Sequence, residues 1–284
     1  MTADAAAEIF YRPRVGADGV IVGAHRSRRI GGQGVFLDHV SYLHQPNPRR
    51  IDLRLTLRDP FETVYVRRYE QRLAIALYAV VDLSRSMKFT GTARKLALVG
   101  ELCACLARSA RRSGDTFGLI GCDAQVREDF FFPATRRNGL ELDIERRFEG
   151  FVPTRGSVDG LIDAAVHLAG KRKLIFLVSD FHIPLMFLET VLQSLAHHDV
   201  VPILVSDSAE ESALPSFGLI DVRDLETEKH RLVFMRPALR RRWLAQAAAQ
   251  RQSLDQLFVR YGRAPFELVD RFDADQLSRH LLET

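Results

Sequence analysis

Apolar and polar residues follow one another along the chain in blocks that predict strands and helices in turn. The most apolar block is the nine-residue run 73–81, and similar runs recur at 116–122, 173–179 and 200–206. Such continuous apolar runs are typical of strands buried on both faces of a parallel sheet. A long segment with apolar residues at helical spacing, 91–112, follows the first run. The pattern therefore predicts an α/β fold with a mostly parallel sheet.

The remaining predicted elements continue this alternation. The predicted strands are 73–81, 116–122, 125–132, 173–179, 200–206, 219–224, 230–235 and 265–269. The predicted helices are 91–112, 138–149, 158–169, 184–197, 237–261 and 274–282. We expect strand 125–132 to pair antiparallel with 116–122, and 230–235 to return along 219–224. Pro237 favours the first turn of the long helix, where its missing N–H is not needed.

The first 72 residues do not share this pattern. Residues 1–22 end in the turn-like sequence Gly-Ala-Asp-Gly and are expected to be disordered or loosely packed. Residues 23–72 mix Gly, Pro and Arg with short strand-like runs, which predicts an extended arm packed on the main domain. The predicted organisation is therefore a loose N-terminus at 1–22, an arm at 23–72 and an α/β domain at 73–284.

Composition limits the class of protein. A chain of 284 residues with 46% hydrophobic content can bury one large core and a small appendage. The longest apolar run is nine residues, far short of the roughly 20 that span a bilayer. The N-terminus lacks the basic and apolar regions of a secretory signal. The three cysteines, Cys103, Cys105 and Cys122, have no metal-ligand spacing, so we expect reduced thiols in a cytoplasmic protein.

Positive charge is concentrated near the N-terminus. Residues 1–72 contain 12 arginines, no lysine and eight acidic residues. A basic face of this kind attracts nucleic acid or an acidic protein, although an arginine-rich surface exposed to solvent explains the same composition. No aromatic residues are interleaved for stacking on bases. Nucleic-acid binding through this segment is therefore kept only as an alternative function.

Short polar side chains follow the predicted parallel strands at positions where one metal site would need them. Three of them follow the strand 73–81 at alternate positions, one precedes the helix 158–169, and one follows the strand 173–179. The five residues are Asp82, Ser84, Ser86, Ser157 and Asp180. Open α/β sheets bind ligands at the carboxyl ends of their strands. Carboxylate and hydroxyl oxygens suit a small hard cation, so the sequence predicts a site for Mg²⁺ or Mn²⁺.

The choice of serine has a chemical consequence. Hydroxyls are neutral ligands, so the ion would keep much of its positive charge and would favour an Asp or Glu carboxylate from another protein. Two alternatives remain open at this point. Ser84 and Ser86 would also suit the cap of the following helix, with Asp180 merely beginning a loop. Thr154 competes with Ser157 for the hydroxyl of the second loop.

The constellation resembles the metal-ion-dependent adhesion site of von Willebrand factor A domains, which combines Asp-x-Ser-x-Ser with a later Thr and a later Asp. In this chain those positions are 82–86, Ser157 and Asp180. The resemblance implies a von Willebrand factor A-like, doubly wound sheet. It also implies that Ser84, Ser86 and Ser157 ligate the ion directly, with Asp82 and Asp180 acting largely through water.

Further stretches make the chain similar to the bacterial DUF58 group, whose A-like domains are encoded beside MoxR-type AAA+ ATPases. The stretches are Arg-Ser-Arg-Arg-Ile-Gly-Gly-Gln-Gly-Val-Phe at 26–36, Pro-Arg-Arg-Ile-Asp at 48–52, Val-Arg-Arg-Tyr-Glu at 66–70 and Val-Ser-Asp-Phe at 178–181. The similarity runs from about residue 23 to the C-terminus. It implies a MoxR-type ATPase and a client with an acidic residue as partners. A narrower resemblance is to the accessory proteins encoded with bacterial methanol dehydrogenase.

Two positions depart from the family pattern. The usual Gly-Thr of the second metal loop is Gly156-Ser157, and serine lacks the methyl that restrains the hydroxyl rotamer. Weaker metal binding is therefore expected. The acidic pair that normally precedes Arg-Arg-Ile-Asp is replaced by Gln-Pro-Asn-Pro at 45–48.

Two classes of function remain, and the sequence favours the first. The first is a non-enzymatic, metal-dependent adaptor that binds other proteins. The second is a Mg²⁺-dependent phosphohydrolase with Asp82 as nucleophile. No lysine follows Asp180 in a loop where it would balance developing phosphate charge. The glycines at 31–34 lack the context of a phosphate loop, and His182 is expected at the rim of the site.

Overall fold

The computed structural model describes residues 8–14, 22–212, 215, 217–223 and 230–283. It divides into two units. The smaller unit contains residues 13–75, and the larger contains residues 1–12 and 76–284. Among the described residues, no helix combines the length and the apolar character needed to cross a bilayer.

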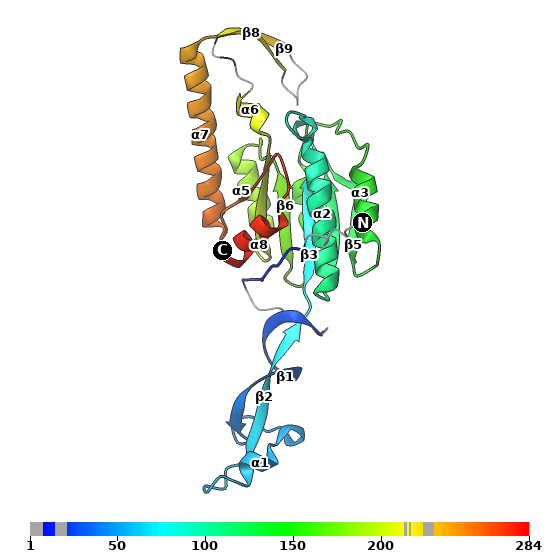
Figure 1. Ribbon diagram of the computed structural model, residues 1–284, viewed down its shortest axis with the longest axis vertical. Coiled ribbons are helices and arrows are strands. Elements are labelled where there is room, and N and C mark those ends of the chain that lie inside the picture. The colour runs from blue at the N-terminus through cyan, green and yellow to red at the C-terminus, as the bar shows by residue number, and fades with distance from the viewer. Residues whose placement is uncertain (1–7, 15–21, 213–214, 216, 224–229, 284) are drawn as a thin grey trace, which may run out of the picture. The chain divides into compact units, whose positions relative to one another are not determined.

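The larger unit is built on a six-stranded sheet (Figure 1). Across the sheet the strands are β10 (Phe266–Val269), β7 (Asp199–Ser206), β6 (Leu174–Ser179), β3 (Ala76–Asp82), β4 (Thr116–Cys122) and β5 (Val126–Thr135). All neighbouring pairs are parallel except β4 and β5. The chain builds outward from β3 to β5 and then in the other direction from β6 to β10, so its direction of growth reverses between β3 and β6. The predicted doubly wound, mostly parallel sheet is confirmed.

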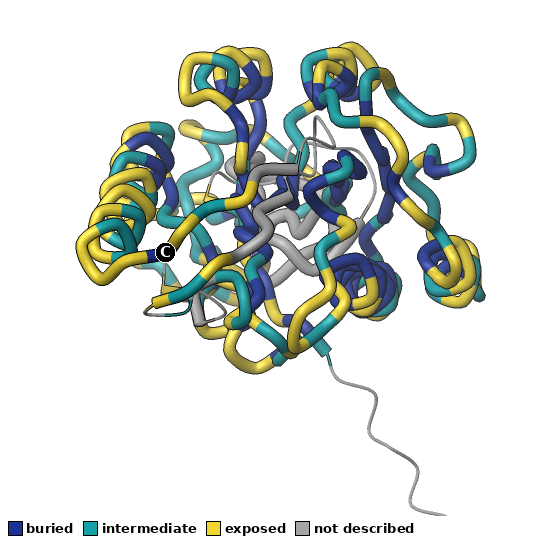
Figure 2. The backbone as a smooth tube through the Cα atoms, turned by 90° about the horizontal axis from the view of Figure 1, so that it is seen from above, coloured by how far each residue is buried: buried dark blue, intermediate teal, exposed yellow. Residues whose placement is uncertain are grey.

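Helices cover both faces of this sheet, and their outer sides are exposed (Figure 2). The helices are α2 (Lys95–Arg112), α3 (Leu140–Phe148), α4 (Gly160–His167), α5 (Leu185–Ser194), α6 (Ser208–Ser212), α7 (Pro237–Arg260) and α8 (Ala274–Glu283). One face packs against α4, α5 and the C-terminal part of α7 in a shared apolar core. Helix α2 lies on the other face, beside β4 and β7. Because the central strands are buried on both sides, β6 has no exposed residue.

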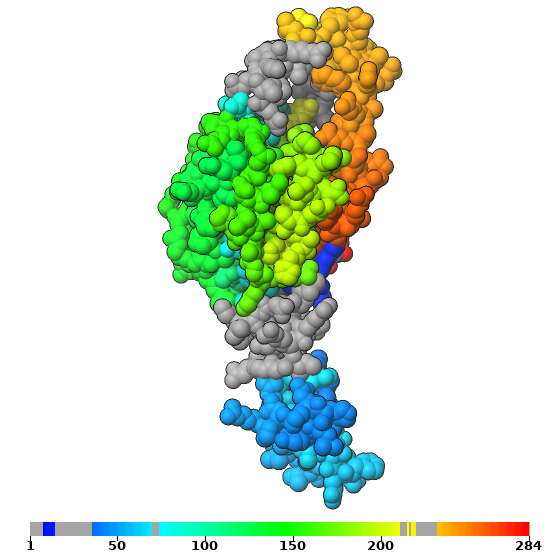
Figure 3. Space-filling view, turned by 180° about the vertical axis from the view of Figure 1, so that it is seen from behind, coloured from blue at the N-terminus to red at the C-terminus, as the bar shows by residue number. Residues whose placement is uncertain are grey.

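The N-terminal half of α7 has no buried residue. The buried residues of α7, Leu254, Leu257 and Phe258, all belong to the last part of the helix. The space-filling view places α7 along one edge of this unit (Figure 3). A two-stranded hairpin, β8 (Gly218–Arg223) and β9 (His230–Met235), precedes it, and its predicted antiparallel pairing is confirmed.

The smaller unit contains a long antiparallel ribbon. It consists of β1 (Val22–Ser41) and β2 (Tyr65–Leu73), with η1 (Pro48–Arg50) and α1 (Leu53–Thr56) between them. Asp52 stabilises the turn, since its carboxylate accepts from the N–H groups of Arg54 and Leu55 and from the Nε of Arg67 at 2.8 Å. The hydrogen bond from Arg67 is the main cause that lowers the pKa of Asp52 below its usual value. Burial acts in the opposite direction but is a smaller effect.

The prediction of a loose N-terminus is wrong for residues 8–12. Ile9 and Tyr11 are buried against the larger unit, with 1% and 7% of their surface exposed. The N–H of Ile9 donates to the hydroxyl of Ser109 at 2.8 Å, and the Tyr11 hydroxyl donates to Asp115 at 2.7 Å. These partners lie about a hundred residues away, so local sequence does not reveal them. Residues 1–7 and 15–21 lie outside the described residues.

Two predicted boundaries also shift. The strand predicted at 73–81 is divided, because β2 ends at Leu73 and β3 begins at Ala76. The helix predicted from residue 91 begins at Lys95. The reason is Asp207, whose carboxylate accepts from the N–H groups of Gly91, Thr92 and Ala93 at 3.0–3.2 Å and holds them as a loop.

Replacing Ile9 by alanine should lower the free energy of unfolding by about 2–4 kcal/mol, because a buried side chain is lost. The matched control is Phe10→Ala, since Phe10 is 58% exposed and follows Ile9 directly. That control should change the unfolding free energy by less than about 0.5 kcal/mol. Urea unfolding of both variants measures the difference. Equal effects would contradict the packed position of residues 8–12.

Asp207 should stabilise the fold in a pH-dependent way. Burial would raise its pKa, but the backbone N–H donors outweigh burial and lower the pKa to about 2. Its contribution is therefore present above about pH 4, the range of an unfolded Asp, and is lost as pH falls through about 2. Asp207→Ala should cost about 2–3 kcal/mol at pH 7 and much less near pH 2. Urea unfolding of wild type and variant across this range tests the effect, and a constant difference would refute it.

Candidate metal site

Asp82 and Asp180 lie side by side at the point where the chain reverses its direction across the sheet. Asp82 is the last residue of β3, and Asp180 directly follows β6. The two strands are parallel neighbours, with Val81 opposite Val178. In doubly wound sheets this switch point is where ligands bind. The sheet therefore brings together the two acids that the sequence placed almost a hundred residues apart.

Asp82 is fully buried and is held on both of its oxygens. Oδ1 accepts from the N–H of Ser84 at 2.8 Å, and Oδ2 accepts from the hydroxyl of Ser179 at 2.6 Å. Burial is the main cause that raises its pKa to about 6, and the nearby charge of Asp180 adds to the effect. The two hydrogen bonds act in the opposite direction but do not offset it. The buried carboxylate therefore favours a nearby positive charge.

The hydroxyls of the first loop connect to Asp180. The Oγ atoms of Ser84 and Ser86 are 3.0 Å apart, and Ser86 Oγ donates to Asp180 Oδ1 at 3.2 Å. Ser84 is the N-cap residue of the short helix η2 (Arg85–Lys88), but its side chain makes no capping hydrogen bond. Capping is thus not the role of these hydroxyls. They form a chain of oxygen atoms that ends on a carboxylate.

The backbone after Asp180 takes an uncommon conformation. Phe181 has a φ of 52°, in the left-handed region that non-glycine residues rarely adopt. Its buried ring packs edge-on against Phe258 with centroids 4.9 Å apart, which holds the turn in place. The turn brings the N–H of His182 to Asp180 Oδ1 at 3.2 Å. Strained backbone at such a position is common at functional sites.

A lysine that the sequence analysis did not single out also belongs to this cluster. Lys95 is the first residue of α2 and is 1% exposed. Its Nζ lies 3.1 Å from Asp180 Oδ2 and 2.6 Å from Glu210 Oε1. Burial would raise the pKa of Asp180, but the hydrogen bond of His182 and the charge of Lys95 lower it below its usual value. Burial would lower the pKa of Lys95, but Asp180 and Glu210 raise it, so the amine is protonated.

The position of Lys95 in its helix indicates, from the sequence, that this charge is buried. It lies four residues before Val99 and seven before Leu102, on the stripe of α2 that packs inward. A charge on such a stripe needs a buried partner. The sequence alone could not identify that partner, because Asp180 and Glu210 lie far along the chain.

The second loop lies beside the first but does not contribute a hydroxyl to the cluster. Ser157 Oγ donates to the carboxylate of Asp159 at 2.7 Å. The loops are joined through the backbone, because the N–H of Arg85 donates to the carbonyl of Arg155 at 2.8 Å. Thr154 also approaches through its carbonyl, which accepts from the Arg85 guanidinium. The structure thus brings together four of the five predicted residues. The fifth, Ser157, binds Asp159 in its own loop instead.

The donor atoms suit a hard cation in type, though not in number. Ser84, Ser86, Asp82 and Asp180 offer oxygen only, as Mg²⁺ and Mn²⁺ prefer. Among the described residues, no group of three His, Cys, Asp or Glu could hold a metal without such hydroxyls. The four residues fit part of a coordination shell, and water or a partner would have to complete it.

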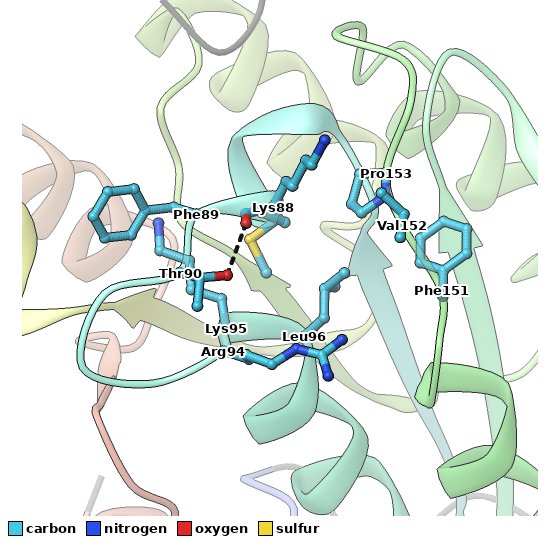
Figure 4. Close-up of a pocket in the computed structure, with 10 residues that line it drawn as sticks. Lys88, Phe89, Thr90, Arg94, Lys95, Leu96, Phe151, Val152 and Pro153 are labelled. Atoms are coloured by element: carbon cyan, nitrogen blue, oxygen red, sulfur yellow. Dashed lines mark hydrogen bonds between the residues drawn. The ribbon is translucent and has the colours of Figure 1, made fainter. Parts of the chain in front are cut away.

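Two cavities border the cluster. The smaller, about 170 Å³, is lined by η2, the first residues of α2 and residues 151–153 (Figure 4). There the amine end of Lys95 lies beside the Phe89 ring, 5.8 Å from its centroid. The larger, about 960 Å³, lies between α7 and the carboxyl ends of β6, β7 and β10, with Asp180, His182 and Glu210 in its wall. The side chains beside Ser84 and Ser86 differ in exposure to solvent, since Lys88 is exposed whereas Met87 is buried.

Solved structures similar to this chain include several von Willebrand factor A domains. BatB from Bacteroides thetaiotaomicron is 13% identical, with a TM-score of 0.46 over 74% of this chain and 98% of that one. Proximal thread matrix protein 1 from the mussel byssus, with a zinc-occupied MIDAS motif, is 17% identical, with a TM-score of 0.35 over 47% and 38%. The SpRpn10 VWA domain is 16% identical, with a TM-score of 0.34 over 48% and 76%.

Sequence comparison identifies a family for this chain. No curated protein matches this chain. One family matches residues 41–253, which include all four clustered residues and most of the arm. The protein therefore belongs to the family described as "Protein of unknown function DUF58".

Proposed function

We propose that the protein is a non-enzymatic adaptor that binds other proteins through a Mg²⁺ or Mn²⁺ ion held at the carboxyl edge of its sheet. The observation that supports this most is the buried chain of oxygens from Ser84 through Ser86 to Asp180, beside the fully buried Asp82. By the family resemblance the serine hydroxyls would ligate directly and the two acids largely through water, so the direct ligands would be neutral and a bound ion would retain positive charge. An acidic residue of a partner would then complete the shell.

The geometry gives less support to a phosphohydrolase. A nucleophilic Asp82 would need a free oxygen facing the substrate, but the residue is fully buried and both oxygens accept hydrogen bonds. Lys95 does supply the basic group that the sequence analysis did not find near Asp180. Its amine is already paired with Asp180 and Glu210, however, and is not directed at solvent.

The proposed partners follow from the family resemblance. We propose a MoxR-type AAA+ ATPase and a client that supplies the acidic residue, with the pair acting in the maturation or remodelling of a complex. Methanol dehydrogenase is the narrower candidate for that complex. The described cysteines are all free and buried, as expected for reduced thiols, and we place the activity in the cytoplasm.

The purified protein should bind Mg²⁺ or Mn²⁺ at one site. Asp82→Ala or Ser84→Ala should lower the metal affinity by about 100-fold or more while the fold survives, since outer-shell changes alone cost 10–100-fold. Titration calorimetry measures the affinity, and circular dichroism checks the fold. Ser253→Ala is the matched control, because its hydroxyl donates only to its own helix at Ala249. Unchanged affinity in both site variants would disprove the metal site.

Partner binding should depend on the ion. EDTA, Asp180→Ala and Ser86→Ala should each release the ATPase or the client, with a loss of about 2–5 kcal/mol for a desolvated charged contact. Pull-down with the purified ATPase measures this, and Asp275→Ala on α8 is the control for loss of an exposed acid. Retention of the partner in EDTA, together with a normal yield from Asp180→Ala, would exclude metal-bridged binding even though the fold is unchanged.

A further inference from the structure

We infer that Lys95 is a built-in cation that competes with the metal ion for Asp180, with Glu210 as the residue that keeps the ammonium when the metal binds. The inference rests on the proposed metal site and adds a means of regulating it. In the absence of metal, the Lys95 ammonium neutralises the cluster. When a metal ion binds, Asp180 is either shared between the ion and Lys95 or released by Lys95 to the ion.

The contacts of Lys95 are those of a neutralising charge rather than of a surface lysine. Its side chain is 1% exposed, as is that of Asp180, whereas the Glu210 side chain is 24% exposed. The ammonium thus connects one candidate metal ligand, through Asp180 Oδ2, to one carboxylate outside the site. The other oxygen of Asp180 accepts from Ser86, so the lysine and the serine chain meet on the same carboxylate.

The backbone that carries Lys95 is held in place. Lys95 begins α2, and the loop before it is held by three N–H bonds to Asp207. The Phe89 ring lies over its amine. A metal ion bound by Ser86 and Asp180 would therefore lie within a few ångströms of the buried ammonium. Two positive charges that close repel strongly in a buried site, so the lysine must weaken metal binding.

Glu210 offers the ammonium a second place. It belongs to the short helix α6, which directly follows Asp207, and it borders the larger cavity. At 2.6 Å it is the nearer of the two carboxylates to Nζ. A small shift toward Glu210 would withdraw the ammonium from Asp180 Oδ2, which would keep its contact with His182 Nδ1 at 3.3 Å, without leaving the ammonium unpaired. Removal of Glu210 should consequently strengthen the hold of Lys95 on Asp180.

The test compares Mg²⁺ and Mn²⁺ affinity by calorimetry in full-length wild type, Lys95→Met, Glu210→Gln and Lys88→Met. Lys95→Met keeps most of the length of the side chain but not its charge, and should bind metal about tenfold more tightly or better. Glu210→Gln should bind more weakly than wild type. Lys88→Met removes an exposed charge of the same loop region and should change the affinity by less than about twofold.

Thermal unfolding gives a second readout. Without metal, Lys95→Met should melt below wild type, because its buried carboxylates lose their counter-charge, and Mg²⁺ should raise its melting temperature more than that of wild type. A folded Lys95→Met with equal or weaker affinity would overturn the inference while leaving the metal-dependent function intact. If neither protein binds metal, both proposals fall together. If Lys95→Met does not fold without metal, tighter rather than weaker binding by Glu210→Gln would overturn the inference.

Discussion

The central constraint in this structure is the burial of two carboxylates side by side. Asp82 and Asp180 meet because the chain reverses its direction of growth across the sheet between β3 and β6. Isolated charges in an apolar interior cost several kcal/mol each unless they are paired and hydrogen-bonded. The surrounding features provide this compensation. The loop with Ser84 and Ser86, the left-handed turn at Phe181 and the buried Lys95 each place a donor or a charge on one of the two acids.

A third aspartate on the same edge shows how the number of hydrogen-bond donors affects a buried carboxylate. Asp207 follows β7 as Asp180 follows β6, yet its carboxylate accepts from four backbone N–H groups and its pKa is about 2. Asp82 accepts one N–H and one hydroxyl, and its pKa is about 6. The two acids share a residue type and a sheet edge but differ in the number of donors. At Asp207 the backbone alone stabilises the charge, whereas at Asp82 the two donors do not offset the cost of burial.

The sequence was sufficient for those parts that depend on local order. Alternating apolar blocks predicted the parallel sheet, and polar residues at the ends of two blocks predicted the cluster of Asp82, Ser84, Ser86 and Asp180. The missed features all depend on distant contacts. Lys95 needs Asp180 and Glu210, the helix start depends on Asp207, and Ile9 packs near Ser109. Ser157 lacks the methyl group that would restrain its side-chain rotamer, and the structure places its hydroxyl on Asp159 rather than in the cluster.

Asp52 is a hydrogen-bonded acid of the arm, and its contacts show how some arginines of the first 72 residues are used. Asp52 ends the Pro-Arg-Arg-Ile-Asp stretch and binds Arg67 of the Val-Arg-Arg-Tyr-Glu stretch, so the two family-like sequences meet in one contact. The next arginine, Arg68, pairs with Asp38 across the ribbon. The side chains of arginines 26, 28 and 29 lie outside the described residues. At least two arginines of this basic segment are thus used within the ribbon, where they join its strands. An arginine-rich composition is therefore partly a requirement of the arm's own structure, and it is correspondingly weaker support for binding to nucleic acid.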